Sequence, residues 1–77
     1  MVIATVISDC GAAVIDQSGN ETKKIIPFGS CGEIVRDEYV KGKRFVVVQF
    51  KKLRALVHPD DIYEDYEFSE SELAFAA

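Results

Sequence analysis

The chain is poor in the residues and runs that mark several large classes of protein. It has no Trp, a single His and only two Cys among 77 residues. No apolar run approaches the roughly 18 residues that a membrane-spanning helix needs. The N-terminal MVIATVISD also lacks the basic region and the small-residue cleavage site of a signal peptide. We therefore expect a cytoplasmic protein that makes no membrane contact.

The two cysteines do not form a Cys-x-x-Cys pair, so their spacing does not resemble a zinc site. In a cytosolic chain, Cys10 and Cys31 are expected to be small, partly buried thiols. A disulfide between them stays open, because two hairpin loops could bring them together. A metal site made by both cysteines with His58 and Asp60 is the less favoured interpretation. We predict no metal and no cofactor.

The residues that could support catalysis are few. His58 stands before Pro59, with Asp60 and Asp61 following, and a His beside a carboxylate can act as a general base. Such a base needs a nucleophile and a cleft, and a chain this close to the lower size limit for folding has little room for one. A loop histidine capped by the Asp pair is therefore favoured. The chain also lacks a phosphate-binding or dinucleotide-binding glycine motif, and we predict that it is not an enzyme.

What the chain does contain is a series of short β-branched and aromatic segments separated by Gly, Asn, Asp and Pro, which is typical of an all-β domain. The expected strands cover residues 1–8, 12–16, 21–28, 33–40, 44–50, 53–58 and 62–64. Apolar residues on both faces of 44–50 predict a central strand. Pro27 indicates that the strand at 21–28 ends there or lies at an edge. Residues 33–57 are expected to form three consecutive antiparallel strands. Their contributors to the core are predicted to be Ile34, Val46, Val48, Phe50, Leu56 and Val57.

Three residues are predicted to shape the turns. Gly29 and Gly32 allow a tight reversal where a side chain would clash, so Gly32 is expected in a backbone conformation that other residues would strain. Pro59 ends the strand at 53–58.

A Gly-x-x-Gly-x-Ile-Val segment at Gly29, then Val-x-Val-x-Phe, then ALVHPDDIYE, together resemble the Src-homology-3-like small barrels. That family includes KOW-type ribosomal and transcription-factor domains, the photosystem I accessory subunit and the variable chain of ferredoxin–thioredoxin reductase. The resemblance covers residues 29–64. It implies an all-β, five- to six-stranded barrel in which a single-turn helix at Pro59-Asp60-Asp61 precedes a last strand at Ile62-Tyr63.

The same resemblance implies a binding module, but the chain departs from two of its subgroups. Peptide-binding Src-homology-3 domains use a Trp and an early tyrosine-rich motif for proline-rich ligands, and this chain has neither. KOW-type domains usually carry a basic groove, whereas this chain has a net charge of −4. We therefore expect an accessory subunit or protein-interaction module. The alternative is a KOW-like nucleic-acid-binding module that uses the basic stretch 23–54.

Charge is distributed unevenly along the chain. All nine Lys and Arg lie in residues 23–54 with only three acids, a net of +6, whereas the rest holds ten acids and no base. One interpretation is that these charges only solvate the surface and protect strand edges. In a second, the basic loops bind an acidic protein or nucleic acid. In a third, the acidic C-terminal end folds back over the basic face and competes with a partner. The expected partner-binding residues are Lys41, Lys43, Arg44, Lys51, Lys52 and Arg54.

The last residues form a segment distinct from the barrel. We expect residues 1–65 to be a single barrel domain and residues 66–77 to be a short acidic tail, either mobile or forming two helical turns from a capping box at Ser69 and Glu72. The main partner contact is expected on the basic face and not on the tail.

Overall fold

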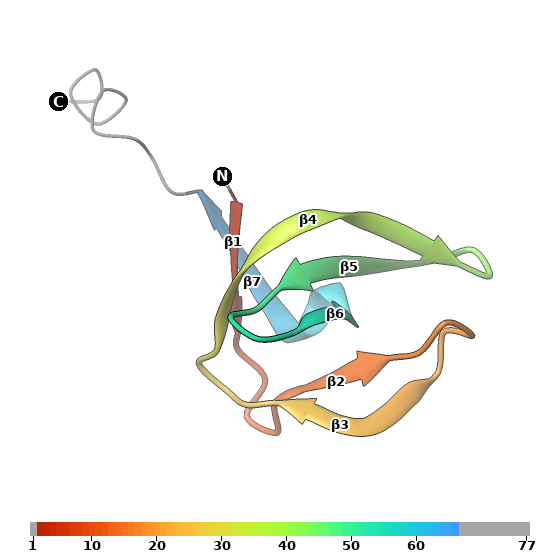
Figure 1. The fold of residues 1–77 in the computed structure, drawn as a ribbon, viewed down its shortest axis with the longest axis horizontal. Coiled ribbons are helices and arrows are strands. Elements are labelled where there is room, and N and C mark those ends of the chain that lie inside the picture. Colours follow the sequence, from red (N-terminus) through yellow and green to blue (C-terminus); the bar gives the residue numbers. More distant parts are fainter. Residues whose placement is uncertain (1, 67–77) are drawn as a thin grey trace, which may run out of the picture.

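Seven antiparallel strands form one sheet that curls into a half-barrel in the computed structural model, which describes residues 2–66 (Figure 1). The order across the sheet is β3-β2-β6-β5-β4-β1-β7. The elements are β1 (Val2–Val6), β2 (Ala12–Ile15), β3 (Glu21–Ile26), β4 (Cys31–Val40), β5 (Lys43–Gln49), β6 (Arg54–Val57), a single-turn 3-10 helix η1 (Pro59–Asp61) and β7 (Ile62–Tyr66).

The all-β prediction is confirmed, including the short helix before the last strand, but the expected count of five to six strands is wrong. The hairpin β2–β3 joins the sheet because β2 pairs with β6 at Ile15 and Leu56, and this adds two strands. As expected, β3 lies at an edge and ends before Pro27, and β5 is central between β4 and β6. Among the described residues no helix is long and apolar enough to cross a membrane.

The long strand β4 links the two halves of the sheet. Its first residues pair with β1, and from Glu33 onward it pairs with β5 (Figure 1). The register shifts between Ile34 and Arg36, which marks a β-bulge. Before the bulge, Ile34 packs against the core, whereas Arg36 pairs with Val47, whose side chain lies on the other face. The bulge therefore decides which β4 side chains face away from the core.

The hydrophobic core lies inside the curl of the sheet. Its buried members are Ala4, Val6, Ala12, Ile26, Val46, Val48, Phe50, Ala55, Val57 and Ile62. Of the predicted core residues, Val46, Val48, Phe50 and Val57 are buried there, and Ile34 is partly buried against them. The prediction for Leu56 is wrong. Its two neighbours on β6 both face the core, so strand alternation turns Leu56 to the opposite face.

The turn residues divide into two kinds. Lys41 and Gly42 both have positive φ, 52° and 80°, which is the backbone of a two-residue type I′ hairpin loop between β4 and β5. Gly29 also has a positive φ of 86°. The prediction that Gly32 has a strained backbone conformation is wrong, because this residue lies within β4 and does not have a positive φ. A Cβ there would instead lie 2.7 Å from both the Gln49 carbonyl oxygen and Val48 Cγ1.

The predicted C-terminal tail covers residues 66–77. Tyr66 is the last residue of β7, and residues 67–77 lie outside the described residues.

Candidate functional site

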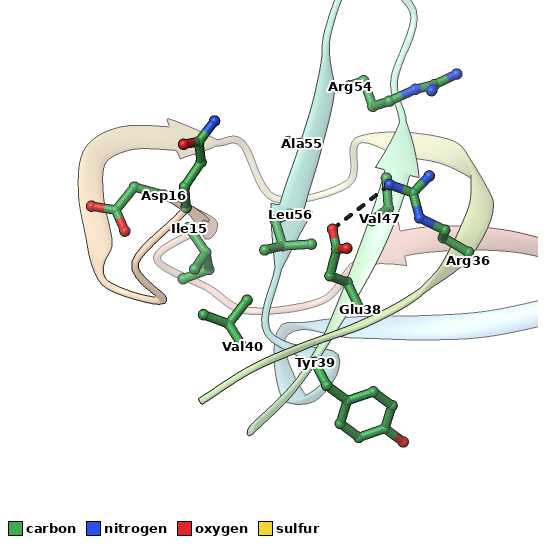
Figure 2. Close-up of a pocket in the computed structure, with 11 residues that line it drawn as sticks. Ile15, Asp16, Arg36, Glu38, Tyr39, Val40, Val47, Arg54, Ala55 and Leu56 are labelled. Atoms are coloured by element: carbon green, nitrogen blue, oxygen red, sulfur yellow. Dashed lines mark ion pairs between the residues drawn. The ribbon is translucent and has the colours of Figure 1, made fainter. Parts of the chain in front are cut away.

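An open groove of about 410 Å³ lies on the face of the sheet that points away from the core. Its floor is apolar: Val47 on β5 and Leu56 on β6 are paired neighbours, and Ile15 on β2 pairs with Leu56. Figure 2 shows Ile15 of β2 and the adjacent Asp16 on one side of Leu56 and Arg36 and Glu38 of β4 on the other. The groove is lined by Ile15, Asp16, Gln17, Arg36, Glu38, Tyr39, Val40, Val47, Arg54, Ala55 and Leu56.

Charged side chains form the rim of the groove. Arg36 Nη2 lies 3.7 Å from Glu38 Oε2, and both side chains are exposed (Figure 2). Arg54 Nε donates a 2.9 Å hydrogen bond to Gln49 Oε1. Asp16 Oδ1 accepts hydrogen bonds of 2.9 Å from the backbone N–H groups of Ser18 and Asn20, so this carboxylate is engaged in its own turn. Within residues 2–66, Arg54 forms no ion pair.

The tip of the β2–β3 hairpin packs against the end of the β4–β5 hairpin beside the groove. Gly19 has a φ of 86°, and a Cβ added to it would lie 3.2 Å from Val40 Cγ1 and 3.8 Å from Phe45 Cε2. Phe45 is fully buried in this contact, although its side chain lies on the face opposite the core. Two hairpins that are far apart in the sequence therefore meet at their ends, and the groove lies between them.

The structure does not bring the six predicted basic residues together. Lys41 and Lys43 lie at the β4–β5 turn, whereas Lys51 and Lys52 lie at the β5–β6 turn, at the other end of β5. Of the six residues only Arg54 lines the groove.

Arg44 is bound to acids on two other strands. Its Nη2 lies 3.1 Å from Asp37 Oδ1 on β4 and 3.5 Å from Glu64 Oε1 on β7. The hydrogen bond to Asp37, followed by the charge of that carboxylate, raises the pKa of Arg44 above its ordinary value. Because β5 and β7 are separated in the sheet by β4 and β1, this guanidinium ties two distant strands of the half-barrel together. We therefore do not place it on the contact face.

His58 is held by groups other than the expected Asp pair. Its ring lies 5.3 Å from the Phe45 ring, centroid to centroid, and its Nε2 lies 3.8 Å from Glu21 Oε2. Asp60 and Asp61 form no ion pair with it within the described structure. The ring thus covers the outer edge of Phe45, and the prediction of an Asp-capped histidine is wrong because the β2–β3 hairpin supplies the carboxylate.

Both cysteines are free and exposed, so the expectation of partly buried thiols is wrong. Cys31 Sγ lies 3.5 Å from Thr5 Oγ1 and donates to the Gly29 carbonyl at 3.7 Å. Across residues 2–66, no group of three or more His, Cys, Asp or Glu side chains is placed to hold a metal ion.

Sequence reasoning did not find the groove. It placed Leu56 in the core and did not select Arg36 or Ile15 for a site. The signal for Leu56 was present, because its neighbours Ala55 and Val57 can face the core only if Leu56 does not. The signal for Arg36 was absent, because its face depends on a bulge that no turn residue marks in the sequence.

Comparison of the chain with protein-family models, with curated proteins and with solved structures gives no significant match.

Proposed function

We propose that this protein is a Src-homology-3-like small barrel that works as a non-catalytic protein-interaction module. The observation that carries the proposal is the groove, which combines an apolar floor with a charged rim. This is the arrangement by which protein surfaces bind a segment of a partner, since apolar contacts supply most of the affinity and polar groups fix the orientation. The strand order supports the barrel assignment, because β4, β5 and β6 form a meander and a single-turn helix leads to β7 beside β1.

The separation of the basic loops favours a protein partner over nucleic acid. A nucleic-acid backbone is bound by Lys and Arg side chains that line one continuous path on the protein surface. Lys41 and Lys51 instead lie at opposite ends of β5. At the groove Arg36 is paired with Glu38, whereas Arg54 forms no ion pair within residues 2–66. Arg54 therefore suits an acidic side chain of a partner segment that also carries apolar side chains.

The test is a pull-down from the source cell with three forms of the full chain, each with and without nuclease. Leu56→Asp places a charge on the half-buried groove floor, and Val35→Asp makes the same change at an exposed position of β4 outside the groove. We expect a protein partner that survives nuclease treatment, is retained by Val35→Asp and is lost with Leu56→Asp. Circular dichroism confirms that each variant is folded.

Two outcomes would overturn the proposal. Loss of the partner after nuclease treatment would favour the KOW-like nucleic-acid reading. Equal retention by both variants would show that the groove is not the contact surface.

A further inference from the structure

The cationic side of the groove has unmatched charge. Arg54 on β6 is exposed and its guanidinium bonds to the neutral Gln49 side chain. Lys51 and Lys52 follow at the adjacent β5–β6 turn, and both are exposed. On the other side of the groove, Asp16 is satisfied by its own turn. An acidic segment that approaches from the β5–β6 turn therefore meets positive charge first.

The end of β7 lies in the same row of paired residues across the sheet as Arg54. The strand registers link Asp65 to Ile3, Ile3 to Glu33, Glu33 to Gln49 and Gln49 to Arg54. Residues that pair across antiparallel strands share a face of the sheet. With neighbouring strands about 4.8 Å apart, four steps span about 19 Å along the curled sheet. In Figure 1 the end of β7 and the β5–β6 turn also lie on the same side of the molecule.

The segment that follows β7 has the length and the chemistry to reach and match the groove. Residues 67–77, EFSESELAFAA, hold three acids, three large apolar side chains and no base. Eleven extended residues reach about 36 Å at most, well beyond the ~19 Å estimated above. The acids Glu67, Glu70 and Glu72 complement the Arg54 side of the rim, and the large apolar residues suit the floor around Leu56.

We propose that residues 67–77 bind this groove within the same molecule and compete there with the protein partner. The inference rests on the proposed role of the groove as a binding site and adds its regulation. A tethered segment of this length has an effective concentration in the millimolar range. A segment whose affinity is too weak for it to bind as a free peptide can therefore occupy the groove for a substantial fraction of the time when it is tethered. An external partner must then displace this segment.

The test is paramagnetic relaxation enhancement on the full chain. A nitroxide is attached at Ala77→Cys in a Cys10→Ser, Cys31→Ser background, which is tolerable because both native thiols are exposed and free. We expect broadening of the methyl signals of Ile15, Val47 and Leu56 that is unchanged on tenfold dilution.

Two double variants have the same charge change. Arg36→Glu with Arg54→Glu alters the groove rim and should reduce the broadening several-fold. Lys23→Glu with Lys24→Glu alters two exposed lysines of the edge strand β3 and should leave it unchanged.

Three results would overturn the inference. Absence of groove broadening would show that the segment does not bind there, and a groove-dependent pull-down would still stand. Broadening that falls on dilution would assign the contact to a second copy of the chain. An equal change of the broadening in the two double variants would show that the charges of Arg36 and Arg54 do not hold the segment in the groove.

Discussion

At the scale of single residues, a position can require glycine because another strand lies close to it and not because of its own backbone angles. Gly32 shows this best, because the strand runs in a regular conformation and the neighbouring β5 leaves no room for a side chain. The close approach of β5 to β4 at this point requires a residue without a Cβ.

We expect Gly32→Val to lower the free energy of unfolding by roughly 1–3 kcal/mol, because the new side chain must displace Val48 or the Gln49 carbonyl. A thermal melt measures the loss, with Val35→Ala at an exposed position of the same strand as the control. A melting temperature equal to that of the control would contradict the close approach.

Val48 is fully buried, and its neighbours in the core are all apolar. Val48→Asp should therefore leave the chain unfolded at 25 °C, because an unpaired buried charge costs several kcal/mol, comparable with the whole stability of a small domain. Val35→Asp adds the same charge at an exposed position and should remain folded by circular dichroism. A cooperative melt of the Val48 variant near that of the wild type would show that this face is not the core.

At the scale of elements, the β2–β3 hairpin is held by its turn as much as by its strands. The strands β2 and β3 pair in antiparallel register with one register shift between Ala13 and Ile15. The Asp16 carboxylate accepts hydrogen bonds from backbone N–H groups of the loop between the strands. The hairpin tip then contacts Val40 and Phe45 through Gly19. The wall of the groove on this side therefore depends on a correctly formed turn.

Asp16→Ala removes two hydrogen bonds to backbone N–H groups and should destabilise the hairpin by about 1 kcal/mol. Amide hydrogen exchange should accelerate at Ser18 and Asn20, while the amides of β5 respond only through global stability. Asp9→Ala, an exposed acid in another loop, is the matched control. Unchanged exchange at both loop amides would show that the carboxylate does not hold the turn.

At the scale of the whole molecule, residues 2–66 already form a seven-stranded sheet with a continuous apolar core among themselves. The last strand is secured by five register pairs with β1, and Glu64 on it bonds to Arg44 across the sheet.

Truncation after Tyr66 should leave the melting temperature almost unchanged, since a terminal segment that binds the groove only weakly contributes little to the free energy of unfolding. Affinity for an acidic partner should increase, and the increase should shrink as salt is raised, because exposed charges are screened within about 10 Å at 0.1 M. Unfolding of the truncated chain would show that the segment belongs to the core. Loss of partner binding by a folded truncation product would make the segment itself the binding element.

The sequence by itself determined the all-β class, the positions of most strands, the β4–β5 turn and the central place of β5. Local turn chemistry and side-chain alternation act over a few residues and leave a direct pattern, as at Lys41-Gly42 and along residues 44–50. The tertiary structure alone decided which outward-facing residues meet. The β4 bulge turns Arg36 outward, the β2–β6 pairing brings Ile15 to Leu56, and the packing of Gly19 on Val40 and Phe45 brings two distant hairpins together. The contacts of Ile15 and of Gly19 join residues about 20 to 40 positions apart. No local sequence pattern specifies such a pairing, because its register is selected by burial across the whole sheet.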